Sequence, residues 1–293
     1  MGLRTTISER QHRLGFELKQ LREQAGLNAA EAAQRIGMSR AQLSHIELGR
    51  TSILTERLLE LCHTCGCTDK PYIDALVSLS EATGKGWWSA HKKHLGSGAL
   101  NLAELEAQAA SLRVHESLFI PGLFQTADYA RAIFNSPKLG FENINEALKF
   151  RMERQHILTR KNPPSVHAVI HEAALHMRFG SAHVVREQLV RLIELARLPN
   201  VTIQVYPFSA QAYAALSGNF VHVIPHTPRL GTVVLDRATA TDYLREPAQL
   251  DQYGTLFDRL AENALGPVDV SLAPDAHSVK NSLSLIQHLL YTL

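Results

Sequence analysis

Two short segments near the start of the chain carry their own helix start and stop signals, and they limit the possible fold more than any other feature. Asn28 is followed three residues later by Glu31, and Ser39 is followed three residues later by Gln42, so each segment begins with a capping box. A glycine follows each predicted helix and ends it. Two short helices joined by "GMS" predict a helix-turn-helix, whose second helix is presented to the major groove of DNA.

The second of these helices has two distinct faces when its residues are placed at about 100° per residue. Leu43 and Ile46 fall on one face and are expected to pack inward. Polar side chains on the opposite face can reach base edges, and the helix N-termini can offer backbone N–H groups to phosphates. An arginine just beyond the closing glycine is placed for the DNA backbone. The predicted DNA-binding residues are Asn28, Arg40, Ala41, Gln42, Ser44, His45, Arg50 and Thr51.

The charge of the chain does not by itself indicate a nucleic-acid protein. The formal net charge is only +2, and residues 1–67 carry nine Lys and Arg against seven Asp and Glu. DNA binding is therefore expected to depend on individually placed residues and on a homodimer bound to an inverted repeat, rather than on a large basic field. No run of eighteen apolar residues and no apolar leader segment occurs, so we expect a cytoplasmic, nucleoid-associated protein without a membrane partner.

The residues after the helix-turn-helix predict an α+β protein. Residues 1–69 form the predicted DNA-binding domain, 70–98 a helical connector, and 99–293 a larger domain with a mixed, mainly antiparallel sheet and helices. The segment "HLGSGAL", residues 94–100, is the most linker-like stretch. The predicted strands lie in "SLFIPGLFQT", "SVHAVI", "VTIQVYPF", "GNFVHVIP" and "GTVVLD". The predicted helices of this domain lie near 127–134, 142–160, 182–197, 247–264 and 275–290.

The stretch "HEAALH" looks like the helix motif of zinc proteases with one extra residue. His171 and His176 are five residues apart, which is about 140° around a helix, so they cannot ligate the same zinc from one helix. A site built by folding from several histidines is the remaining alternative; those histidines are His167, His171, His176 and His183. We expect no bound metal and no catalytic zinc.

The cysteines are all contained in "LCHTCGC". Cys62 and Cys65 have the C-x-x-C spacing of a zinc or redox pair, and Cys67 follows, but no second half-site occurs downstream. Reduced thiols at the end of a helix are therefore the expected state. No nucleophile elbow or dinucleotide glycine pattern is present either, so we expect no catalytic residue, no cofactor and no enzymatic activity.

The segment "LREQAGLNAAEAAQRIGMSRAQLSHIELGR" resembles the XRE-type, phage-repressor-like helix-turn-helix family. In that family an arginine late in the first helix pairs with the glutamate of an "IExGR"-like ending. The resemblance therefore implies an ion pair between Arg22 and Glu47. One departure is Ala29, which stands where the family often has a polar residue that contacts phosphate.

The later motifs "GWW", "IPGLFQTADYARAIF", "RMERQHIL", "HEAALHMRFGS", "QLVRLIELARLPNVTIQVYPF" and "SGNFVHVI" occur in that order. They resemble the large C-terminal domain, of unknown function, of antitoxin-like XRE regulators. The resemblance implies a transcriptional regulator, a repressor by expectation, often encoded beside a small partner protein. In this family "HEAALH" falls at a strand-to-helix junction. Asp236 and Arg237 depart from the usual pattern, so what that edge recognises is expected to differ.

Two roles remain open for the C-terminal domain. The leading one is the binding of a small partner protein, and the alternative is the sensing of a small molecule. Candidate residues for either role are Trp87, Trp88, Phe119, Phe124, Gln125 and Tyr129. An apolar stripe near the C-terminus either helps a dimer or covers its own domain; it consists of Leu283, Ile286, Leu290 and Leu293.

Overall fold

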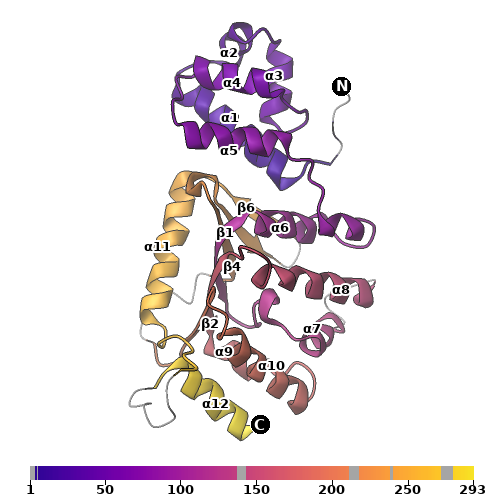
Figure 1. The fold of residues 1–293 in the computed structure, drawn as a ribbon, viewed down its shortest axis with the longest axis vertical. Coiled ribbons are helices and arrows are strands. Elements are labelled where there is room, and N and C mark those ends of the chain that lie inside the picture. Colours follow the sequence, from indigo (N-terminus) through magenta and orange to yellow (C-terminus); the bar gives the residue numbers. More distant parts are fainter. Residues whose placement is uncertain (1–3, 5, 137–142, 211–217, 238–239, 272–279) are drawn as a thin grey trace. The chain divides into compact units, whose positions relative to one another are not determined.

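The computed structural model describes the chain apart from residues 1–3, 5, 137–142, 211–217, 238–239 and 272–279 (Figure 1). The chain divides into two compact units. Unit 1 comprises Met1–Ser89 with Ala99–Leu105, and unit 2 comprises Ala90–Gly98 with Glu106–Leu293. No helix among the described residues is long and apolar enough to span a membrane.

Unit 1 contains, among the described residues, most of α6 (Ser97–Ala107) and five complete α-helices: α1 Glu9–Gln24, α2 Ala29–Arg35, α3 Arg40–Glu47, α4 Thr55–Thr64 and α5 Lys70–Glu81. A short 3-10 helix, Trp87–His91, follows them. The core consists of side chains that come from different helices and are fully buried; they are Leu18, Leu43, Leu58, Leu61 and Leu76. Helices α2 and α3 begin and end within a residue or two of the positions that the capping signals predict.

The boundary between the units differs from the expected one. Helix α5 packs on α1 and α4, so it belongs to unit 1 and is not part of a separate connector. The expected linker is also partly helical, because α6 spans Ser97–Ala107. Its residues in unit 1 are held by Glu104, which pairs with Arg10 Nε at 2.8 Å in a buried ion pair, and by Asn101, which accepts from the backbone N–H of Glu9. The two glycines of this stretch obscure the helix in the sequence.

Gly15 of α1 lies where α1 and the end of α3 approach most closely. A Cβ atom at this position would lie 2.3 Å from the carbonyl oxygen of Glu47 and 2.8 Å from that of Ile46. Both atoms belong to the backbone and cannot rotate away. We therefore expect Gly15→Ala to destabilise unit 1 by at least about 1–3 kcal/mol, although alanine is the better helix former. Chemical denaturation of the variant checks this; a gain in stability would show that α3 moves freely relative to α1.

The described part of unit 2 contains a six-stranded sheet in the order β3-β2-β1-β4-β5-β6. The strands are β1 Ala109–Glu116, β2 Ser165–His171, β3 Val201–Tyr206, β4 Phe220–Pro225, β5 Thr232–Asp236 and β6 Thr241–Leu244. Strands β1, β2 and β3 run parallel, whereas β4, β5 and β6 continue the sheet from β1 in antiparallel fashion. The expected α+β fold with a mixed, mainly antiparallel sheet is confirmed.

Helices cover both faces of this sheet. The remaining helices are α7 Ala127–Phe134, α8 Ile144–Arg154, α9 Glu172–His176, α10 Ala182–Leu195, α11 Pro247–Asn263 and α12 Ser282–Thr292. Helix α11 packs on one face, and α7, α8, α10 and α12 lie on the other side (Figure 1). The core under α11 is formed by side chains from the sheet and the helix; they are Val169, Tyr206, Phe220, Val233, Leu250, Phe257 and Leu260.

The strand expected in "SLFIPGLFQT" is wrong. The strand lies upstream and ends at Glu116, and residues 117–126 form an irregular segment with one 3-10 turn at Gly122–Phe124. In this segment, side chains provide hydrogen-bond partners for the backbone in place of a neighbouring strand. Gln125 Nε2 donates to Ile120 O at 2.7 Å, and Gln188 Oε1 accepts from the backbone N–H of Thr126 at 2.7 Å. Such side-chain partners arise from the tertiary fold and leave no local pattern in the sequence.

Candidate nucleic-acid interface

The two capping boxes predicted for α2 and α3 are both formed. Asn28 Oδ1 accepts from the backbone N–H of Glu31 at 3.0 Å, and Glu31 Oε2 accepts from that of Asn28 at 3.1 Å. The backbone N–H of Gln42 donates to Ser39 Oγ at 3.2 Å, and the backbone N–H of Ser39 donates to Gln42 Oε1 at 2.9 Å. The amide oxygens of Asn28 and Gln42 are therefore used within the protein, which leaves their NH₂ groups as the outward donors.

Helix α3 has a buried face and a solvent face. Leu43 and Ile46 are buried, as expected. On the solvent side, Arg40, Ala41 and Gln42 are exposed, and the next turn continues this surface with Ser44 and His45, which are partly exposed. One helix therefore brings five of the predicted DNA-binding residues together.

The remaining three predicted residues flank α3. Asn28 begins α2 and is exposed. Gly49, with φ of 72°, turns the chain out of α3, so that the backbone N–H groups of Arg50 and Thr51 donate to His45 O at 2.8 and 3.3 Å. Arg50 is exposed and Thr51 is partly exposed.

Arg22 and Glu47 join α1 to the end of α3. Arg22 Nε donates to Glu47 Oε1 at 2.6 Å and Arg22 Nη2 donates to Glu47 Oε2 at 3.0 Å, so the pair is bidentate. Each side chain is only 8% exposed. The hydrogen bond to Glu47 is the main cause that raises the pKa of Arg22, and Arg22 Nη1 also donates to Leu27 O at 2.9 Å in the turn before α2. This one guanidinium fixes α3 and the start of the helix-turn-helix together.

Arg57 is a further basic residue at this site, and sequence analysis did not single it out. Its Nη1 donates to Ile36 O, the carbonyl at the end of α2, at 2.7 Å, and it also contacts Glu60 on its own helix at 2.6 Å. Arg57, which lies on α4, thereby caps the C-terminal end of α2. Only the packing of α4 beside the turn reveals this role, because the two segments are about twenty residues apart in the sequence.

The cysteines and the "HEAALH" segment show no metal-binding geometry in the described residues, which contain no cluster of three potential ligands. Burial raises the pKa of the Cys62 thiol to about 12, and burial also raises that of Cys65. His171 ends β2 and caps α9, its Nδ1 accepting from the backbone N–H of Ala173 at 3.1 Å. The segment is thus a strand-to-helix junction in which the imidazole has a capping role.

The aromatic candidates for a binding site are divided between the two units, and within each unit they are mainly packed into the core. Trp87 and Trp88 belong to unit 1, where Trp88 is buried and Trp87 packs against it edge to face. In unit 2, Phe124 and Tyr129 are fully buried core residues, Gln125 is buried, and Phe119 stacks on Phe179. The apolar stripe near the C-terminus also serves its own unit: Leu283 and Ile286 are buried where α12 packs on α9, α10 and β3, whereas Leu290 is partly and Leu293 well exposed.

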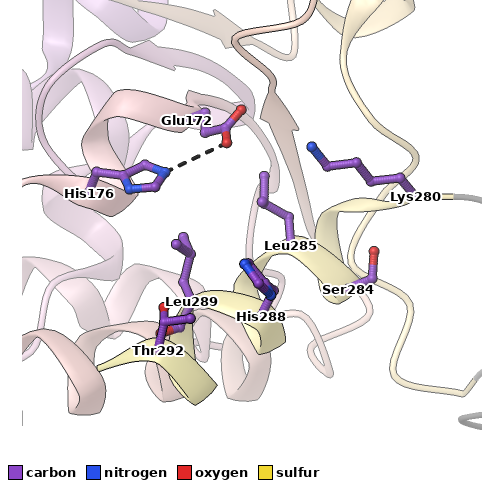
Figure 2. Close-up of a pocket in the computed structure, with 8 residues that line it drawn as sticks. All are labelled: Glu172, His176, Lys280, Ser284, Leu285, His288, Leu289 and Thr292. Atoms are coloured by element: carbon purple, nitrogen blue, oxygen red, sulfur yellow. Dashed lines mark hydrogen bonds and ion pairs between the residues drawn. The ribbon is translucent and has the colours of Figure 1, made fainter.

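A cavity of about 600 Å³ does occur in unit 2, at a place that the sequence did not indicate. Figure 2 shows it between α9 and α12. Its lining residues are Glu172, His176, Lys280, Ser284, Leu285, His288, Leu289 and Thr292. Its size is in the range of sites for small metabolites.

Comparison with known families yields two matches. A helix-turn-helix domain matches residues 13–72, which run from within α1 into α5, and this match indicates a DNA-binding regulator. A domain of unknown function, DUF5753, matches residues 100–270. No curated protein and no solved structure matches the chain. Because the second match covers more than half of the 293 residues, the chain belongs to the DUF5753 family and carries a helix-turn-helix domain before it.

Proposed function

We propose that this protein is a sequence-specific, antitoxin-like transcriptional regulator of the XRE type, without enzymatic activity, that reads an operator with α3. The observation that carries the proposal is the solvent face of α3. This face presents Arg40, Gln42, Ser44 and His45, while two capping boxes and the Arg22–Glu47 pair hold the helix in place. A rigid helix with polar side chains on its outer face suits the major groove.

Arg40 and Arg50 are expected to contribute differently to this binding. Arg40 lies on the first turn of α3, so Arg40→Ala should weaken operator binding by about 1–3 kcal/mol and relax the preference at one base position. Arg50 lies beyond the helix, so Arg50→Ala should weaken operator and scrambled DNA alike and lower the salt slope by about one unit. Affinities for both sequences across a salt series provide the measurement. If Arg40→Ala changes neither affinity nor base preference, another face of unit 1 contacts the DNA.

The proposed operator is an inverted repeat bound by a homodimer. Three leucines support an additional interface in unit 1, because they are unusually exposed for their size: Leu48 directly follows α3, Leu54 directly precedes α4 and Leu59 lies on α4. Leu48 is 48% exposed, Leu54 is 71% exposed and Leu59 is 45% exposed. Footprinting should show two protected half-sites about one helical turn apart. A single unrepeated half-site at stoichiometric binding contradicts the dimer.

For unit 2 we propose the binding of a small partner protein. The two edges of the sheet differ in a way that supports this role. At β3, the backbone N–H groups of Leu265 and Val268 donate to Val205 O and Ile203 O, so the edge is covered. At the other edge, β6 pairs with β5 and with no further strand of the described residues. A short edge strand without a further strand beside it can accept a strand from another protein.

The partner proposal is tested by co-expression with the product of the adjacent gene. We expect a complex of fixed stoichiometry in size-exclusion chromatography and a changed operator affinity when the partner is added. Separate elution of the two proteins at micromolar concentration contradicts the proposal.

The sensing of a small molecule by unit 2 is a second candidate function, and one observation favours it. The cavity between α9 and α12 has both charged and apolar lining groups, which is the composition of a ligand site.

A further inference from the structure

The cavity of unit 2 lies beside the parallel half of the sheet. Its α9 wall directly follows β2, one of three parallel neighbouring strands. Ligands of sheets with parallel strands are commonly bound at the carboxyl ends of those strands. The position of the cavity is therefore consistent with a ligand site rather than with a packing defect.

Helix α12 and Lys280, which lies two residues before it, supply one wall. Ser284, His288 and Thr292 are spaced four residues apart and follow one side of the helix, and Lys280 lies in the non-helical segment before it. Leu285 and Leu289 each follow one of them by one residue and form an adjacent apolar strip; both are buried. The wall therefore offers an ammonium, an imidazole and two hydroxyl groups next to a short apolar surface.

The α9 wall carries the opposite charge. Figure 2 shows Glu172 on this wall and Lys280 on the facing wall, both directed into the cavity. Glu172 Oε2 accepts from the backbone N–H of Phe208 at 2.7 Å, and its Oε1 lies 3.6 Å from His176 Nε2. These contacts hold the carboxylate in place and leave part of its acceptor capacity unused.

The groups of the α12 wall differ in how they are already engaged. The Ser284 and Thr292 hydroxyls donate to Asn281 O and Leu289 O at 2.9 and 3.0 Å. Lys280 and His288, in contrast, make no hydrogen bond or ion pair with any described residue, and Lys280 forms none with Glu172 across the cavity. The Glu172 carboxylate thus faces the Lys280 ammonium and the His288 imidazole across a space that no side chain of the described residues fills.

We propose that this cavity binds a small zwitterionic metabolite with an amine, a carboxylate and a short apolar group, of which a free apolar amino acid is the simplest form. The amine contacts Glu172, the carboxylate contacts Lys280 and His288, and the apolar group packs on Leu285 and Leu289. A ligand without an amine leaves the buried Glu172 carboxylate without a counter-charge, which is unfavourable, and a ligand without a carboxylate gives up the charge-assisted contact with Lys280. The proposal rests on the second candidate function and names its ligand class.

Calorimetric titration of the full chain tests the ligand class, with L-leucine, L-methionine and L-valine as probes. We expect saturable binding of at least one of them. The same compound should bind at least about tenfold more weakly when its carboxylate is converted to an amide or its amine is acetylated, because each change removes a charge-assisted contact. Equal binding of a blocked analogue, or no saturable binding of any probe, overturns the proposal.

Variants test the site. Lys280→Met and Glu172→Gln should each weaken binding at least about tenfold; glutamine keeps an acceptor oxygen for the backbone N–H of Phe208, so the wall is retained. Lys161→Met is the matched control, because Lys161 is exposed in the same unit and does not line the cavity. Unchanged binding by Lys280→Met would place the ligand elsewhere. Operator binding is measured with the same protein preparations. A preparation that binds the operator but none of the probes contradicts the ligand proposal alone and leaves DNA binding by α3 intact.

Discussion

Replacing Glu47 by glutamine is expected to destabilise unit 1 by about 3–5 kcal/mol, because the substitution removes the buried counter-charge of the buried Arg22 guanidinium. The magnitude follows from the burial of both side chains, each 8% exposed, and from the two hydrogen bonds of 2.6 and 3.0 Å that join them. Operator affinity should fall as well, since the pair holds the end of α3 on α1.

Tryptophan fluorescence measures the loss of stability in unit 1 specifically. The chain has two tryptophans, and both Trp87 and Trp88 belong to unit 1. Urea denaturation followed by their emission therefore reports the unfolding of unit 1. Glu23→Gln is the matched control, because Glu23 contacts the same arginine at 3.5 Å but is 46% exposed. The control should cost less than about 1 kcal/mol. If Glu47→Gln unfolds at the urea concentration of the control, the buried pair does not stabilise the unit.

Features set by a few neighbouring residues could be predicted from the sequence. The capping residues Asn28, Ser39 and Thr126 each begin the helix that follows them. Such local signals could not predict the order of the strands in the sheet, because β1 lies between β2 and β4 and both come later in the chain. Arg113 is paired with His167 on one side and with His222 on the other, and no local pattern specifies partners so far along the chain. Strand β6, with four partly buried residues, is too short for a periodic signal.

The two candidate sites differ in the same way: one is built from neighbouring residues and the other from distant segments of the chain. The surface of α3 is one helix, so its faces follow from the spacing of Arg40, Leu43 and Ser44. The cavity of unit 2 joins Glu172 to His288, which lie on segments more than a hundred residues apart. Aromatic content does not locate this cavity, because fully buried core residues such as Phe124 have the same composition as the wall of a pocket.

Acid should destabilise unit 2 through the histidines of its sheet. Burial, with a smaller effect of Arg113, lowers the pKa of His222 from its ordinary 6.5 to about 4, and burial also lowers those of His115 and His167. Between these two pH values the unfolded chain binds a proton at position 222 that the folded chain does not. The stabilisation is therefore complete above about pH 6.5 and is lost as the pH falls towards 4, where His222 alone accounts for about 3 kcal/mol.

A comparison of histidine variants separates the contribution of His222 to the free energy of unfolding from that of groups that stabilise the folded state in acid. Burial raises the pKa of Glu116 from 4.5 to about 8, so this carboxyl favours the folded state as the pH falls. The free energy of unfolding, measured by circular dichroism from pH 7 to 4.5, should consequently decline less steeply in His222→Gln than in the unmodified protein. His226→Gln is the control, because this histidine follows the same strand but is exposed. The imidazole of His222 has no partner for Nδ1 among the described residues, so its charged form would gain no compensating contact in the folded state. Equal slopes for His222→Gln and His226→Gln would mean that the sheet opens enough to hydrate the ring before the unit unfolds.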